Sequence, residues 1–89
     1  MAKAIKTSIS TVSGNTVNVD KLEGRTYRTL KAGDYLYART TVRGQAVYFY
    51  GLVSEVLGKG RAVLSFGSYG RVITVAVPEK VNVYRPTPA

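Results

Sequence analysis

The sequence predicts an all-β fold in a single domain spanning residues 1–89. A chain of 89 residues can bury one hydrophobic core, and an apolar fraction of 45% is ordinary for a globular protein. Most of the apolar residues are Val, Ile, Tyr and Phe, which favour strands, and they alternate with polar residues between glycine-containing turns. No segment keeps a period of 3.6 residues, so we expect no long helix.

The first expected element is a β-hairpin over residues 4–22, with its turn near Asn15. A two-residue loop would set Ile9 against Asp20, whereas a three-residue loop that ends at Asn15 sets Ile9 against Val19. We favour the second register because it collects the apolar residues on one side of the hairpin.

A polar, basic connection follows over residues 23–33. Arg25, Arg28 and Lys31 lie close together in it, around Tyr27. The segment is either a solvated loop or strand end with Tyr27 packed inward, or a loop that contacts phosphate groups. The sequence alone leaves both interpretations open.

The strongest signal is a β-hairpin over residues 34–53 with a tight turn at Arg43-Gly44, because glycine supplies the positive φ that a two-residue loop needs. This turn sets the register, and a slip of one residue would bury an arginine. One face is apolar and belongs on a core. The other face, which we call the tyrosine face, carries four tyrosines and an arginine. It is either a second core face, covered by the N-terminal hairpin or by another subunit, or a surface that binds nucleic acid or protein. The apolar face pairs Val42 with Gln45, Thr40 with Val47, Ala38 with Phe49 and Leu36 with Gly51; the tyrosine face pairs Thr41 with Ala46, Arg39 with Tyr48, Tyr37 with Tyr50 and Tyr35 with Leu52.

The second strand continues past Gly51, whose place within a strand indicates a bulge or a sharp bend. Apolar residues then fall on both faces of a strand over 71–77, which predicts cover by another part of the fold or by a partner subunit. Residues 78–80 predict one helical turn, and residues 86–89 a loose tail. The other elements expected are turns over 58–61 and 67–70 and strands over 62–66 and 81–84.

Several short motifs occur in an order that resembles the SH3-like barrel group, and within it Tudor-like domains. They are Gly33-Asp34, the aromatic strand 47–53, the strand and turn 63–70, and Val75. The resemblance implies an SH3-like small barrel of about five strands over residues 30–85, with the hairpin over 4–22 added to it.

In Tudor-like domains an aromatic cage binds methylated lysine or arginine, and the resemblance would assign that role here to Phe49, Phe66 and Tyr69. Two positions differ from the pattern: Ser68 stands where an acidic residue is usual, and Arg71 would repel a cationic ligand. In charge the chain is more similar to the basic chromatin, ribosomal and transcription-factor members of the group, which bind nucleic acid.

Thirteen Lys and Arg residues against five Asp and Glu residues give a formal net charge of +8, which favours a polyanionic partner. The chain has no Cys and no His, which removes the commonest general base and the commonest zinc ligands. The five acidic residues are scattered, and no phosphate-binding glycine motif is present. We therefore expect neither an enzyme nor a metal or other cofactor.

The prediction is a non-catalytic nucleic-acid-binding protein, with DNA ahead of RNA as its partner. The alternative is an oligomerising interaction protein, such as a viral or plasmid structural subunit, and a homo-oligomer is compatible with either. No apolar run has the length of a signal peptide or of a membrane span, so we expect a cytoplasmic protein without a membrane partner, either nucleoid-associated or encoded by a virus or plasmid. The predicted nucleic-acid-binding residues are Tyr35, Tyr37, Arg39, Arg43, Tyr48 and Tyr50 on the central hairpin, and Arg25, Arg28, Lys31, Lys59, Arg61 and Arg71 elsewhere.

Overall fold

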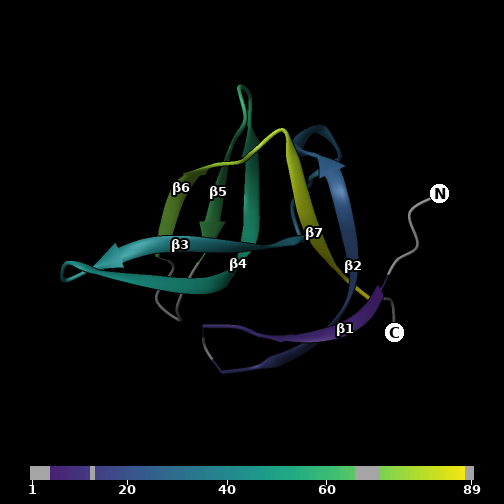
Figure 1. Ribbon diagram of the computed structural model, residues 1–89, viewed down its shortest axis with the longest axis horizontal. Coiled ribbons are helices and arrows are strands. Elements are labelled where there is room, and N and C mark those ends of the chain that lie inside the picture. The colour runs from purple at the N-terminus through teal and green to yellow at the C-terminus, as the bar shows by residue number, and fades with distance from the viewer. Residues whose placement is uncertain (1–4, 13, 66–70, 88–89) are drawn as a thin grey trace.

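A computed structural model describes residues 5–12, 14–65 and 71–87. In these ranges the chain is all-β, with one antiparallel sheet in the order β1-β2-β7-β3-β4-β5-β6 and a short 3-10 turn, η1 (Figure 1). The elements are β1 (Ile5–Ser10), β2 (Thr16–Thr26), η1 (Tyr27–Thr29), β3 (Tyr35–Val42), β4 (Gln45–Leu57), β5 (Arg61–Ser65), β6 (Val72–Ala76) and β7 (Lys80–Pro86).

The central hairpin, β3 and β4, has the predicted register at every pair from Tyr35 opposite Leu52 to Val42 opposite Gln45. Its turn residues both have positive φ, 51° at Arg43 and 80° at Gly44. A two-residue turn of this kind matches the right-handed twist of the strands. The predicted register and the division of side chains between two faces are therefore confirmed. The prediction that the apolar face lies on a core was right only for the inner part of the hairpin, because Val42 and Val47 are exposed.

The N-terminal hairpin, β1 and β2, forms as predicted, but the predicted register was wrong by two residues. Ile9 lies opposite Val17 instead of Val19, because the turn is longer than three residues. The backbone N–H of Thr11 donates to the carbonyl oxygen of Asn15 at 2.8 Å and closes this wider turn. A shift of two residues keeps each side chain on its predicted face, since side chains alternate along a strand.

The core has two parts, which share the strand β7. The larger cluster gathers buried side chains from β3, β4, β5 and β7 and from the segments beside them; it contains Leu30, Leu36, Val53, Ala62, Leu64, Val77 and Val83. The smaller cluster packs the N-terminal hairpin against β7 and contains Ile9, Val19 and Tyr84. Thr11 adds an isolated parallel bridge to Tyr50 of β4.

Several local predictions need correction. No bulge lies at Gly51: the register of β4 with β5 shifts between Val53 and Glu55, and that of β2 with β7 shifts between Leu22 and Arg25. Residues 78–80 form no helical turn; the 3-10 turn η1 lies in the segment predicted to be a loop or strand end. It forms there because the backbone N–H of Leu30 donates to the carbonyl oxygen of Tyr27 at 3.0 Å.

The sheet also continues into the segment expected to be a loose tail. Pro86 is the last residue of β7 and lies opposite Val19, and the N–H of Thr87 donates to the carbonyl oxygen of Asn18 at 2.9 Å. The turn predicted over 67–70, and the cage residues Phe66 and Tyr69, lie outside the described residues. The other cage residue, Phe49, is buried.

Candidate nucleic-acid interface

The tyrosines of the central hairpin form a continuous row of ring contacts. Tyr48 stacks on Tyr37 with ring centroids 5.9 Å apart and an angle of 14° between the rings. Tyr37 also meets Tyr50 at 4.8 Å, and Tyr50 meets Tyr84 of β7 edge to face at 5.1 Å. The row follows from the register of β3 and β4, because directly opposite and diagonal residues on one face of a sheet are within reach of aromatic side chains.

This row passes from the interior to the surface. Tyr35 and Tyr50 pack against the smaller core cluster, so the N-terminal hairpin covers this end of the tyrosine face. Burial, together with the neighbouring Tyr84 hydroxyl, raises the pKa of Tyr50, and Lys21 opposes the shift. Tyr37 and Tyr48, by contrast, are 55% and 58% exposed. Of the four rings on the tyrosine face, Tyr37 and Tyr48 are therefore the two that a large ligand can reach.

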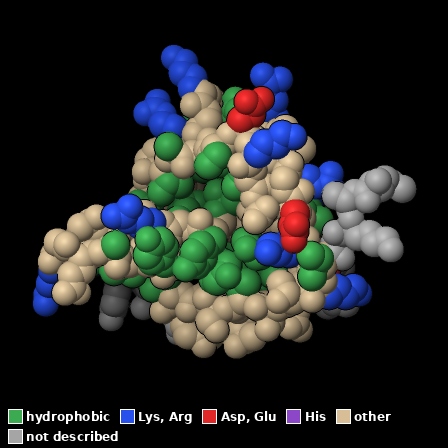
Figure 2. Space-filling view, in the orientation of Figure 1, with side chains coloured by type: hydrophobic (Ala, Val, Ile, Leu, Met, Phe, Trp, Pro, Cys, Tyr) green, Lys and Arg blue, Asp and Glu red, His purple; other side chains and the backbone are tan. Residues whose placement is uncertain are grey.

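The predicted cationic residues do not form one patch. Arg39 and Arg43 are exposed on the hairpin that carries Tyr37 and Tyr48. In the face that Figure 2 shows, hydrophobic side chains form a band across the middle, and Lys and Arg side chains lie around its margins. A polyanion on this face would therefore meet apolar surface first and cations at the edges.

A second group of cations lies at the end of the molecule where β4 turns into β5. Arg28 and Lys59 line one groove of about 430 Å³ together with Glu79. The turn that carries Lys59 projects at the top of Figure 1, away from the Arg43 turn at the left. The group that contains Lys59 therefore lies apart from the exposed tyrosines and the Arg43 turn.

The remaining predicted cations are scattered. Lys31 and Arg71 have exposed positions on other parts of the chain. Arg61 is also exposed, and as the first residue of β5 it follows the turn that carries Lys59. Arg25 is half-buried in β2, and its Nε atom is buried without a hydrogen-bond partner in the described part of the structure. Arg25 is the least suited of the set to bind phosphate.

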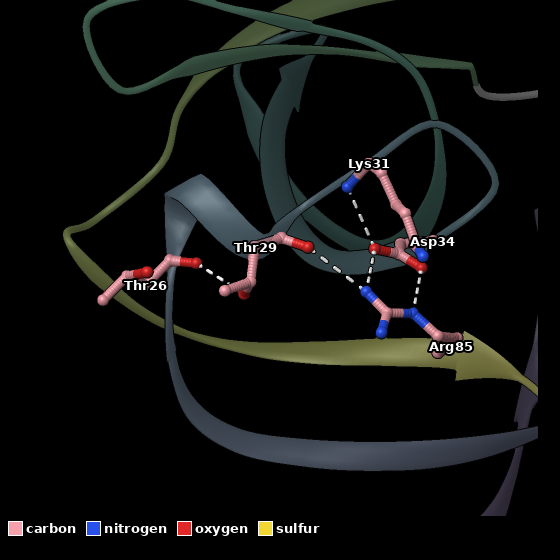
Figure 3. A network of polar contacts seen from close by, with 5 residues as sticks. All are labelled: Thr26, Thr29, Lys31, Asp34 and Arg85. Atoms are coloured by element: carbon pink, nitrogen blue, oxygen red, sulfur yellow. Dashed lines mark hydrogen bonds and ion pairs between the residues drawn. The ribbon is translucent and has the colours of Figure 1, made fainter.

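One cation that the prediction left aside has a structural role. Arg85 donates from Nε to Oδ1 of Asp34 at 2.9 Å and from Nη2 to Oδ2 at 3.0 Å (Figure 3). Its Nη2 also donates to the carbonyl oxygen of Thr29 at 3.2 Å. Hydrogen bonding to Asp34 raises the pKa of the Arg85 guanidinium. The half-buried Arg85 side chain therefore directs two of its nitrogens to partners within the protein, which makes it less available to bind a phosphate.

An apolar groove of about 550 Å³ lies between the turn of the N-terminal hairpin and the central hairpin. Tyr37 and Tyr48 line it, and exposed aliphatic side chains from both hairpins line it as well, among them Val12, Val42 and Val47. This groove could not be predicted from the sequence, because it depends on how the two hairpins lie relative to each other.

Comparisons with protein-family models, with curated proteins and with solved structures give no match for this chain. Within the described residues, no group of three or more His, Cys, Asp or Glu side chains is placed to hold a metal ion. No helix in this part of the chain is long and apolar enough to cross a membrane.

Proposed function

We propose that this protein is a non-catalytic nucleic-acid-binding module, with DNA as the preferred partner, and that it binds through the exposed end of the tyrosine face. The observation that carries the proposal is the Tyr37–Tyr48 ring pair beside Arg39, which lies directly opposite Tyr48. Aromatic rings contact bases or sugars and arginines contact phosphates, so this combination suits a nucleic acid.

The charge of the chain supports the same conclusion. The net charge of +8 attracts a polyanion, and no Asp or Glu occurs between Tyr35 and Ser54. A role of this kind belongs in the cytoplasm, on a nucleoid or on viral or plasmid DNA.

We also propose that the strands from β3 to β7 make an SH3-like small barrel to which the N-terminal hairpin is added. The strand order supports this assignment, since β7, the last strand of the chain, lies beside β3, the first strand of that unit. The two pair directly only at Tyr35 and Tyr84, and among the described residues no ladder joins β6 to β7, so the sheet is not closed into a complete barrel.

The test is a DNA-binding titration of Tyr37→Ala, Tyr48→Ala and the double variant at fixed salt, by fluorescence anisotropy. Each single substitution should weaken binding about tenfold, because a stacked base or a hydrogen bond to a phosphate is worth ~1–3 kcal/mol. Ile5→Ala is the matched control, since Ile5 is a similarly exposed strand residue on β1. If the double variant binds DNA as tightly as the wild type and the control do, the tyrosine face is not the binding site.

A second candidate function, oligomerisation, is favoured by the outer strand β6. Strands at the edge of a sheet are commonly protected by charged residues, as β1 is by Lys6. The sequence of β6, VITVA, has no charged residue, and its Val72 is 55% exposed. Sedimentation without nucleic acid tests this function: an oligomer that Val72→Lys dissociates supports it, and a monomer at all concentrations excludes it.

A further inference from the structure

The end of the central hairpin projects from the body of the molecule as a two-stranded arm. Ala38 and Phe49 are the last opposite pair on the apolar face with a buried member. Beyond them, residues 39–48 are all exposed except the half-buried Thr40. Figure 1 shows these residues extending to the left, away from the other strands. We call residues 39–48 the hairpin arm.

The size of the hairpin arm matches the major groove of duplex DNA. The arm extends four strand residues beyond the Ala38–Phe49 pair on each side and ends in the two-residue turn, which is a reach of roughly 13 Å at the usual rise of a strand, plus the turn. The major groove of B-DNA is about 12 Å wide and about 8.5 Å deep, and it admits a two-stranded β-ribbon. The arm is therefore long enough to reach the base edges while the body of the protein stays outside the groove.

The chemistry of the arm also suits a DNA groove. It carries Arg39 and Arg43 and no carboxylate, so nothing on it repels phosphate. Arg43 lies in the two-residue turn at the tip of the hairpin, and Gln45 is the first residue of the next strand. Arginine pairs with the major-groove edge of guanine and glutamine with that of adenine, which makes these two side chains suitable for reading bases.

We propose that the hairpin arm enters the major groove of duplex DNA, with Arg43 and Gln45 at the base edges and Arg39, Tyr37 and Tyr48 on the flanking backbone. This inference rests on the proposed nucleic-acid function and specifies its ligand as double-helical DNA. The ring pair favours the backbone role for the tyrosines, since the two nearly parallel rings cover part of each other's faces. Duplex RNA is a poor ligand for the arm because its major groove is too deep and narrow for side chains to read.

The first experiment compares ligands. Fluorescence anisotropy would measure the affinity for one sequence in three forms: duplex DNA, single-stranded DNA and duplex RNA. The salt would be held at about 100 mM NaCl, where the Debye length is about 10 Å. Duplex DNA should bind at least about tenfold more tightly than the other two. Methyl green, which occupies the major groove, should displace the protein, and netropsin, which occupies the minor groove, should not.

The second experiment compares the two turns of the molecule. Arg43 and Lys59 are both basic turn residues with positive φ, 51° and 67°, so glycine replaces either one without backbone strain. Arg43→Gly should weaken duplex binding about tenfold or more, whereas Lys59→Gly, which removes the same charge, should weaken it less than about threefold. Arg43→Lys keeps the charge but loses the paired hydrogen bonds to guanine, so its affinity should fall between those of the wild type and Arg43→Gly.

The outcomes separate the two proposals. Binding to single-stranded DNA as tight as to duplex, competition by netropsin, or equal losses in Arg43→Gly and Lys59→Gly would overturn the placement of the arm in the major groove and leave nucleic-acid binding intact. No binding to any of the three nucleic acids would overturn both proposals. Thermal unfolding of each variant shows that a loss of affinity is not a loss of fold.

Discussion

The carboxylate of Asp34 is 2% exposed and accepts three hydrogen bonds. Two come from Arg85, and the third comes from the backbone N–H of Lys31 at 3.1 Å (Figure 3). A buried charge is tolerated only when it is paired in this way. The pair links the start of β3 to β7, where the ladder between these strands has a single opposite pair. One residue therefore strengthens the weakest junction in the sheet.

Replacing Asp34 with asparagine should lower the free energy of unfolding by roughly 3 kcal/mol, because Arg85 loses its counter-charge and the amide nitrogen faces a donor. Urea unfolding measures this change. Glu23→Gln is the matched control: its carboxylate lies 3.8 Å from Lys21 on the surface, and its loss should cost less than about 0.5 kcal/mol. Equal losses in the two variants would show that Asp34 has no special structural role.

The four tyrosines show what could be predicted about single residues. Their common face follows from the alternation of β3 and β4, and it was predicted from the sequence. Their division into two covered rings and two exposed rings was not predicted, because it depends on the place of the N-terminal hairpin. That hairpin reaches Tyr35 and Tyr50 and leaves Tyr37 and Tyr48 in solvent.

Among the strands, β4 shows why a buried glycine can be required without unusual backbone geometry. Gly51 is not at positive φ, and the bulge lies further along the strand. Its role is close packing: a Cβ at this position would lie 3.0 Å from Leu64 of β5 and 3.0 Å from Phe49. The glycine thus leaves room for the side chains of Leu64 and Phe49 to pack against its backbone.

Gly51→Ala should therefore destabilise the protein by about 1–3 kcal/mol through overpacking. Gly58→Ala is the control, because Gly58 has open space around the same position and no positive φ. That substitution should be neutral or stabilise by up to about 1 kcal/mol, since alanine restricts the unfolded chain. Thermal unfolding of the two variants measures the difference, and a Gly51→Ala protein as stable as Gly58→Ala would contradict the packing argument.

The two hairpins show how far turn chemistry determines an element. At Arg43-Gly44 a two-residue turn allows one register, and the prediction was confirmed at every pair. Near Asn15 the residues permit loops of several lengths, and a backbone hydrogen bond from Thr11 selects a longer one. A register is predictable from sequence where the loop length is unambiguous.

At the scale of the whole molecule, an all-β fold was predictable from alternation and turns, but the strand order was not. The place of β7 between β2 and β3 depends on pairings between residues distant in sequence, such as Val19 with Pro86. The role of Arg85 could not be predicted for the same reason, because its partner Asp34 is 51 residues away in the sequence. The positions of the cations likewise depend on the arrangement of the strands, which the net charge does not reveal. Local pattern carries no information about such pairings.

The dispersion of the cations predicts a modest salt dependence of DNA binding. Neutralising each phosphate contributes about −0.9 to the slope of log K against log[salt], so the two arginines of the hairpin arm, with a few neighbouring contacts, give a slope of roughly −2 to −4. Arg39→Gln should reduce the magnitude of the slope by about one, and Arg61→Gln, on β5, should leave it unchanged. Binding titrations between low and moderate salt measure these slopes, and a flat dependence would count against nucleic-acid binding altogether.

The long strand β4 begins in the exposed hairpin arm, where it pairs with β3 alone. It then passes into the body of the protein, where it pairs with β3 as far as Leu52 and with β5 from Leu52 onward. Its first amide protons should exchange with solvent through fraying of the arm, without disturbing the rest of the sheet. The amide of Val53, which donates to the carbonyl oxygen of Asp34 at 2.7 Å, should exchange only when the whole domain opens. One continuous strand thus holds a segment free to adjust its shape and a segment that keeps the fold intact while it does so.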